Sequence, residues 1–115
     1  MKITIVGTGY VGLVSGACFA EFGVNVVCVD NNEEKIKTLK KGNIPIYEPG
    51  LKDIVKKNLK EKRLFFNSNL SDSLRDASAI FIAVGTPSRR GDGHADLSYV
   101  YSAAKEIAKN LDKYA

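Results

Sequence analysis

Three glycines with the spacing GxGxxG follow a short apolar run near the N-terminus. The segment reads GTGYVG and occupies residues 7–12. Where such a segment follows a strand and opens a helix, each glycine has a separate role. Gly7 permits a sharp turn, Gly9 lets backbone amides come close to a pyrophosphate, and Gly12 lets the helix pack tightly on the strand. Because the first amides of a helix are free and lie at its positive end, the segment predicts a dinucleotide phosphate site.

An acidic residue follows at the distance that such a site needs. Asp30 ends the next apolar run, 18 residues after Gly12. This spacing places its carboxylate beside the adenosine ribose, where it accepts hydrogen bonds from both hydroxyls and repels a 2′-phosphate, so it favours NAD over NADP. Lys35 lies one turn into the following helix and can reach the same ribose. Because the Lys35 cation can offset the repulsion between Asp30 and a 2′-phosphate, NADP is the alternative.

A second candidate segment, VGTP, ends the fourth apolar run at residues 84–87. In open α/β sheets, ligands bind in the crevice between the first and fourth strands. Gly85 lets the backbone come close to a ligand, and the Thr86 hydroxyl can bond a ribose or phosphate. A simple strand exit that ends at Pro87 is the alternative here. For the glycine segment, the alternatives are a tight turn without a ligand, S-adenosylmethionine and a bare nucleotide.

The elements that must position these residues alternate between strands and helices. Apolar runs predict strands at residues 2–6, 25–30, 64–66 and 79–84. Helical periodicity predicts helices at residues 10–22, 33–41, 51–60 and 97–111, and a short helical turn at residues 72–76. Ser71 is the expected N-cap of the turn at residues 72–76, and Asp96 is the expected N-cap of the helix at residues 97–111. This order predicts an α/β fold, a Rossmann-like and mostly parallel sheet with flanking helices and the strand order 3-2-1-4.

The burial of these elements is predicted from their apolar positions. Continuous apolar strands suit a sheet that is covered on both faces. In the first helix, one apolar stripe consists of Val11, Val14, Cys18 and Phe22. Cys18 and Cys28 are therefore expected to be reduced, buried packing residues of a cytoplasmic protein, with a disulfide or a catalytic thiol as the alternatives.

Composition limits the classes of protein that need considering. The chain has 115 residues, 44% of them hydrophobic, and its 17 basic and 13 acidic residues give a net charge of +4. These values argue against disorder, and no apolar stretch suggests a membrane span or a signal peptide. The basic stretches at residues 35–41 and 52–63 are interpreted as solvated helix faces, with binding to nucleic acid or an acidic surface as the alternative. The length allows one domain.

Three segments together resemble the UDP-glucose/GDP-mannose dehydrogenase family. Residues 1–30 carry "VGTGYVGLVSG" followed by "VVCVD", residues 44–51 read "IPIYEPGL", and "VGTP" is followed by "GDGHADLSYV". The resemblance covers the whole chain, and the combination is far more specific than any one motif. Within the family, "GNIPIYEPGL" is most similar to the members that act on UDP-glucose. Members that act on GDP-mannose or UDP-N-acetylmannosamine are the alternatives.

The resemblance implies oxidation of a sugar C6 alcohol to a carboxylate with two NAD per turnover. The family's catalytic cysteine lies in a later segment, so neither Cys18 nor Cys28 inherits that role, and we expect no catalytic residue and no metal ligand here. The residues and the resemblance together predict a cofactor-binding set of Gly7, Gly9, Tyr10, Val11, Gly12, Asp30, Lys35, Gly85 and Thr86.

The resemblance also implies that residues 1–115 form a partial N-terminal NAD-binding domain, with the central and C-terminal substrate domains absent. We expect such a piece to bind NAD without catalysis, UDP-glucose being a partner of the full-length enzyme alone. An open sheet edge predicts a homo-oligomer, and no nucleic acid or membrane partner is expected. A non-catalytic nucleotide-sensing module and a basic interaction module are the rival classes. A sensor has no need of the paired segments "IYEPGL" and "VGTP".

Overall fold

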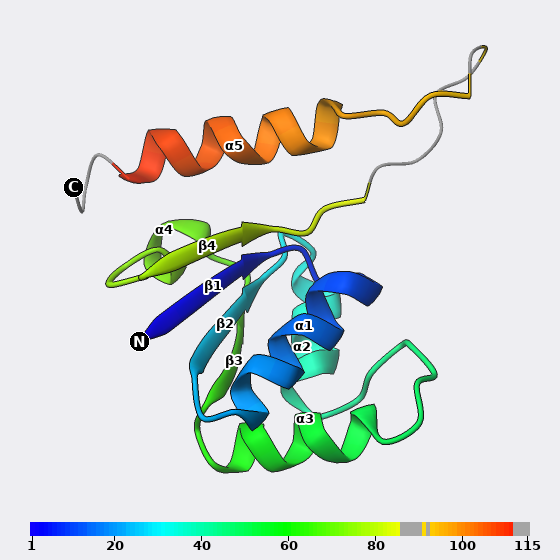
Figure 1. Ribbon diagram of the computed structural model, residues 1–115, viewed down its shortest axis with the longest axis vertical. Helices are drawn as coiled ribbons and strands as arrows, with labels where there is room; N and C mark the ends of the chain where they lie inside the picture. Colours follow the sequence, from blue (N-terminus) through cyan, green and yellow to red (C-terminus); the bar gives the residue numbers. More distant parts are fainter. Residues whose placement is uncertain (86–90, 92, 112–115) are drawn as a thin grey trace.

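A computed structural model describes residues 1–85, 91 and 93–111 (Figure 1). Within these residues the strands are parallel and form one sheet. They are β1 (Lys2–Val6), β2 (Asn25–Val29), β3 (Leu64–Asn67) and β4 (Ala79–Ile82). Their order in the sheet is β3-β2-β1-β4, which confirms the predicted order. The carboxyl ends of β1, β2 and β4 therefore lie together at one end of the sheet.

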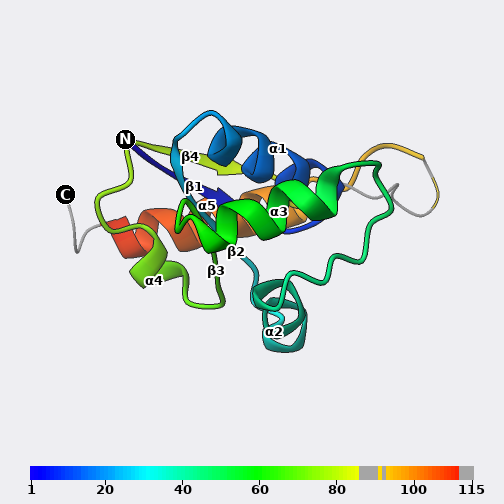
Figure 2. The ribbon, with the colours of Figure 1, turned by 90° about the horizontal axis from the view of Figure 1, so that it is seen from below.

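Helices cover the two faces of this sheet. They are α1 (Tyr10–Glu21), α2 (Glu33–Lys40), α3 (Leu51–Lys60), α4 (Leu70–Ser73) and α5 (Ser98–Leu111). The helices α1 and α3 pack together on one face, while α4 and α5 lie on the other (Figures 1 and 2). Right-handed crossovers require this division, because the chain reverses direction across the sheet after β3. The α/β, Rossmann-like fold class is thus confirmed.

The two faces of β1 are both covered, as its continuous apolar pattern predicts. Ile3 and Ile5 pack into the core under α1. Thr4 is buried on the opposite face, where its hydroxyl donates to the carbonyl of Ser73 in α4 at 2.5 Å. The prediction of two covered faces is wrong for β4, where Phe81 is 45% exposed. Phe81 lies on the α1 face of the sheet, where it stacks on Phe19 with a ring-centroid distance of 5.6 Å, and α1 covers it only in part because β4 is an edge strand.

The apolar stripe predicted for α1 is wrong at Val11, Cys18 and Phe22, because the helix buries mainly small residues, whereas Val14 of the stripe does pack against the core. The buried positions are Gly12, Leu13, Gly16, Ala17 and Ala20. By contrast, Val11 is 65% and Phe22 is 86% exposed. Close helix–sheet packing explains this choice, since a Cβ on Gly16 would lie 2.6 Å from the sulfur of Cys28.

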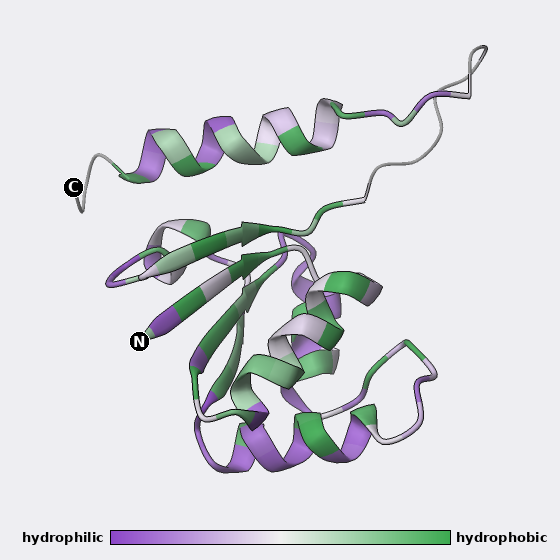
Figure 3. Ribbon diagram, in the orientation of Figure 1, coloured by the Kyte–Doolittle hydropathy of each residue, from purple (hydrophilic) through white to green (hydrophobic). Residues whose placement is uncertain are grey.

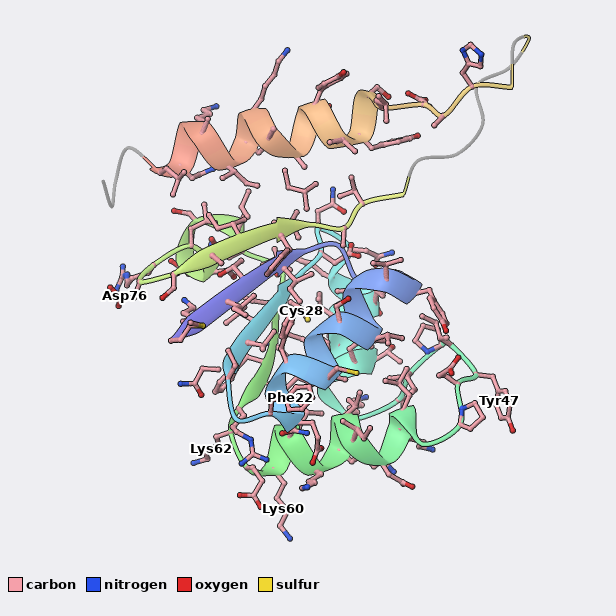
Figure 4. All side chains as sticks on the ribbon, viewed as in Figure 1. Phe22, Cys28, Tyr47, Lys60, Lys62 and Asp76 are labelled. Carbon is pink, nitrogen blue, oxygen red and sulfur yellow. The ribbon has the colours of Figure 1, made fainter. Side chains whose placement is uncertain are left out.

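The two cysteines differ in their surroundings. Cys28 lies in the interior between α1 and the sheet (Figure 4), and burial raises the pKa of its thiol to about 12. Cys18 is exposed, so the prediction that it is a buried packing residue is wrong. It falls on the outer face of α1 because the buried face of that helix is shifted toward the small residues. Both thiols are free.

The short helix α4 begins earlier than predicted. It spans Leu70–Ser73, and its cap is Asn69, whose side chain accepts a hydrogen bond from the amide of Asp72 at 3.0 Å. The expected cap at Ser71 is therefore wrong, because the chain already turns into the helix at Leu70, where Asn69 supplies the cap. The predicted short helical turn exists, but it begins two residues earlier than expected. At the start of α5, Asp96 accepts from the amide of Ser98, the first residue of the helix, at 2.9 Å, so it bonds the helix start from one position before the observed N-cap site.

A polar network joins the end of α1 to α3. Glu21 accepts hydrogen bonds from Lys57 at 2.6 Å and from the fully buried Asn58 at 3.0 Å. These bonds hold the pKa of Glu21 below its ordinary value. Arg63 donates to Asn58 and to the carbonyl of Ala20, so the same network reaches the start of β3. This network fixes α1 at its C-terminal end, opposite the glycine turn.

The outer face of α3 is hydrophilic and exposes lysines, as the interpretation of a solvated helix face predicts (Figure 3). Lys60 points away from the sheet (Figure 4). In the part of the chain that the structure describes, no helix is both long and apolar enough to cross a membrane.

Candidate cofactor site

A cavity of about 1080 Å³ opens at the carboxyl ends of β1, β2 and β4. The turn after β1, the ends of β2 and β4, the start of α4 and one face of α5 form its walls. Of the predicted site residues, those that line it are Gly7, Gly9, Tyr10, Val11, Asp30, Lys35 and Gly85. Parallel strands bring these residues together although they are far apart in sequence.

The first and last glycines of the turn are required by the fold itself. Gly7 has φ +115°, its amide donates to the carbonyl of Val29 at 2.8 Å, and a Cβ there would lie 2.5 Å from the carbonyl oxygen of Ala83. Gly12 is even more confined, because its Cβ would lie 2.1 Å from the oxygen of Gly7. Gly12 lies behind the pocket and does not line it, so it acts through packing.

The middle glycine is different, because protein packing does not require it. Gly9 has φ −75°, a conformation open to any residue, and a Cβ there would meet no atom within 4 Å. It is the N-cap of α1 and makes no side-chain cap, whereas Asn32 caps α2. Since Gly9, Tyr10 and Val11 line the pocket, the positive end of α1 forms part of its wall.

Asp30 is held in place by three groups. Its Oδ2 accepts from the Thr8 hydroxyl at 2.6 Å, its Oδ1 accepts from the Asn32 amide at 3.0 Å, and the Lys35 ammonium lies 3.7 Å from Oδ2. Burial of Asp30 opposes ionisation, but Thr8, the Asn32 amide and Lys35 together outweigh it and hold the pKa of the carboxyl below its ordinary value. The side chain, 18% exposed, is therefore a charged acceptor at the pocket wall.

The loop at residues 44–50 is tied to the glycine turn. The Tyr10 hydroxyl donates to the Glu48 carboxylate at 2.9 Å, and this hydrogen bond raises the pKa of the phenol. The structure confirms the loop between α2 and α3. The segment "IPIYEPG" therefore reaches the rim of the pocket through Glu48, although none of its residues is in the pocket wall.

At the end of β4, Gly85 lines the pocket, and a Cβ there would also meet no atom within 4 Å. Thr86, the other predicted residue of this segment, lies outside the described residues.

Sequence reasoning missed several residues of the pocket wall, among them Thr8, Ser68, Leu70 and four residues of α5. The α5 residues are Tyr99, Ser102, Ala103 and Glu106. Their spacing of i, i+3, i+4 and i+7 marks one helix face, but only the tertiary fold shows that this face meets the strand ends. Thr8 could have been found as the one threonine inside the glycine turn.

The chemistry of the pocket is that of phosphate and ribose recognition. The described residues hold no group of three or more side chains suited to a metal ion. A helix N-terminus at a glycine turn attracts phosphates, and a carboxylate at the end of the next strand accepts from ribose hydroxyls. Together, the fold and the pocket define a dinucleotide-binding domain of the Rossmann class.

Comparison with known proteins identifies the family. The model of the NAD binding domain of the UDP-glucose/GDP-mannose dehydrogenase family matches residues 1–115. The chain belongs to this family, and NAD is the cofactor of the matched domain.

Individual relatives agree with this assignment. The chain is 62% identical over 114 residues to a UDP-glucose 6-dehydrogenase of Rhizobium meliloti (99% of this chain, 26% of the relative) and 55% identical over 113 residues to the UDP-glucose 6-dehydrogenase TuaD of Bacillus subtilis (98% and 24%). It superposes on a GDP-mannose dehydrogenase of Pseudomonas aeruginosa with a TM-score of 0.91 and 35% identity, covering 96% of this chain and 25% of that one. The chain thus spans about a quarter of the length of these relatives.

Proposed function

We propose that residues 1–115 bind NAD in this pocket as the N-terminal cofactor domain of a UDP-glucose 6-dehydrogenase. The observation that carries the proposal is that the uncapped start of α1 and the Asp30 carboxylate line the same cavity. Their separate affinities, for phosphate and for ribose hydroxyls, suit the two parts of an adenosine diphosphate group. The open space beside Gly9 and Gly85 fits a ligand that approaches the backbone closely.

The proposed cofactor contacts divide by chemistry. The turn at residues 7–12 offers amides to the pyrophosphate, with Gly7 and Gly12 shaping the turn. Asp30 accepts from the adenosine ribose, and Lys35 lies beside it at 3.7 Å. Gly85 and Thr86 are proposed to contact the cofactor at the β4 end of the pocket. When bound, NAD supplies a hydride acceptor, and the role of these residues is to hold and orient it.

The proposed reaction of the whole protein is oxidation of UDP-glucose to UDP-glucuronate with two NAD. UDP-glucose is the proposed substrate because the relatives with 62% and 55% identity are named UDP-glucose 6-dehydrogenases. GDP-mannose and UDP-N-acetylmannosamine remain the alternatives, since solved dehydrogenases for both are also similar to this chain. We propose that the substrate domains lie outside residues 1–115, and that these residues bind the cofactor without turning over the sugar nucleotide.

A cytoplasmic location and self-association also belong to the proposal. The free thiols of Cys18 and Cys28 suit a reducing compartment. The edge strand β4 exposes Phe81 and Ile82, which a second copy of the chain would cover. Light scattering should therefore give a mass above 12.5 kDa that rises with concentration. A mass of one chain at every concentration would contradict the self-association.

The test of the proposed function is a calorimetric titration of the folded chain with NAD, NADP and S-adenosylmethionine. We expect NAD to bind at least about tenfold more tightly than NADP, because the Asp30 carboxylate repels a 2′-phosphate. We expect no measurable binding of S-adenosylmethionine, which brings no pyrophosphate to the start of α1. Tighter binding of S-adenosylmethionine or of NADP than of NAD would overturn the proposal.

A further inference from the structure

The Thr8 side chain connects the glycine turn to the end of β2. Thr8 is 1% exposed, and its hydroxyl donates to Oδ2 of Asp30 at 2.6 Å. The GxGxxG pattern leaves this position open to any residue, so the pattern assigns Thr8 no role. Because this buried hydroxyl bonds a carboxylate at the pocket wall, Thr8 is a candidate for a role in ligand binding.

The other partners of Asp30 hold it less firmly. Lys35 is a long side chain, 32% exposed, and its ammonium lies at 3.7 Å, beyond ordinary hydrogen-bond distance. The Asn32 amide fixes only Oδ1, and it comes from the loop that leads into α2. Thr8, by contrast, is 1% exposed and directly follows Gly7, where a Cβ would lie 2.5 Å from the backbone oxygen of Ala83. The hydroxyl of Thr8 is therefore the rigid anchor of the carboxylate.

This anchoring leaves the carboxylate able to bind a ligand. A carboxylate has about four acceptor positions on its two oxygens. The Thr8 hydroxyl, the Asn32 amide and the Lys35 ammonium approach the Asp30 carboxylate, and the backbone amide of Thr8 also lowers its pKa. Oδ1 accepts a hydrogen bond from the Asn32 amide. This leaves Oδ1 able to accept from a ribose hydroxyl, in a direction that is set once the carboxylate cannot rotate.

We propose that Thr8 is a positioning residue that fixes the Asp30 carboxylate for the adenosine ribose and thereby sets the preference for NAD over NADP. This inference rests on the proposed binding of NAD. NAD gains from a correctly oriented acceptor, because both of its ribose hydroxyls are free to donate. NADP lacks the 2′-hydroxyl and does not gain in this way. Loss of the anchor should therefore weaken NAD binding more than NADP binding.

The test uses Thr8→Val, which keeps the side-chain shape and removes the hydroxyl. We expect the Kd for NAD to rise about tenfold, as for loss of a charge-assisted hydrogen bond, with little change for NADP. Thr8→Ser keeps the donor and should stay within about twofold of the wild type. If Thr8→Val does not fold, Thr8→Ala takes its place.

Thr4→Val is the matched control. Thr4 is also a buried threonine with a bonded hydroxyl, but it donates to Ser73 on the face of β1 away from α1. We expect Thr4→Val to lose stability as Thr8→Val does, and to bind NAD like the wild type. A general weakening of the fold would lower NAD binding in both variants alike and would contradict a specific role of Thr8.

A double-mutant cycle with Asp30→Ala separates positioning from direct contact. If Thr8 acts through Asp30, Thr8→Val should cause no further loss of NAD binding once the carboxylate is gone. An equal loss in both backgrounds, or unchanged NAD binding by Thr8→Val, would overturn the inference and leave the proposed function standing. Absence of NAD binding by the wild-type chain would instead contradict the proposed function itself.

Discussion

Gly12→Ala should unfold the domain or destabilise it by about 3 kcal/mol or more, at the upper end of the cost of overpacking. The added Cβ would lie 2.1 Å from the carbonyl oxygen of Gly7, which no contact between real atoms allows. That oxygen belongs to the backbone of a turn already confined against β4, since a Cβ on Gly7 would meet Ala83. Neither side of the contact can move without displacing α1 or opening the sheet.

Unfolding in urea, monitored by circular dichroism, measures this loss of stability. Gly9→Ala is the matched control, because it adds the same methyl group three residues earlier in the same turn, where no atom lies within 4 Å. Gly9→Ala should lower the free energy of unfolding by at most about 1 kcal/mol, the difference between glycine and alanine at an N-cap. Equal unfolding midpoints for the two variants would show that the close packing at Gly12 does not support the fold.

Gly9→Ala should bind NAD at least about tenfold more weakly while keeping the fold, since a methyl group forced against a ligand costs about 1–3 kcal/mol. Gly9 lies at the pocket wall, and its backbone conformation suits alanine. The methyl group therefore fits the protein and occupies space that the pyrophosphate needs. The pair of variants separates the two roles of the motif, with Gly12 serving the fold and Gly9 the ligand.

Calorimetric titration of Gly9→Ala with NAD measures this loss, after circular dichroism has shown a native spectrum. Gly23→Ala is the control for a general loss of stability. Gly23 has φ +96°, so alanine strains the chain at the far end of α1, away from the pocket, and this variant should lose stability but bind NAD like the wild type. NAD binding by Gly9→Ala at the wild-type affinity would mean that the pyrophosphate does not approach the turn at this residue.

The sheet and the glycine turn could be predicted because local patterns determine them. Continuous apolar runs gave the strands, and the handedness of crossovers gave their order, which the structure confirms. The separate roles of Gly7 and Gly12 in shaping the turn are also confirmed by their backbone surroundings.

The buried face of α1 could not be predicted from hydrophobicity. The sequence offers larger apolar residues at Val11, Cys18 and Phe22, but the sheet approaches Gly16 so closely that small residues, together with Leu13, take the buried positions. The distance between α1 and the sheet determines which face of the helix is buried, and that distance depends on the tertiary fold. The same shift exposes Cys18 and brings Val11 to the pocket.

The pocket was predicted from its β1 and β2 sides but not from its α5 side. Gly9 and Asp30 carry recognisable spacing, whereas Tyr99 and Glu106 do not, because their part in the pocket depends on where α5 lies over the strand ends. Thr8 was overlooked for a different reason. Its hydrogen bond joins residues 22 positions apart, and only the parallel pairing of β1 and β2 brings them together.

An NMR titration of the ¹⁵N-labelled chain with NAD, with the chemical shift of every backbone amide followed, tests most directly whether NAD binds at the glycine turn. NAD bound at the N-terminal start of α1 and against Asp30 should shift the amides of residues 8–12 most strongly, followed by those of residues 30–32 and 83–85. The chemical shifts of amides in α3, such as those of residues 53–60, should not change. Shifts that are largest on α3, or no shifts on a folded chain at saturating NAD, would contradict binding of NAD in this pocket.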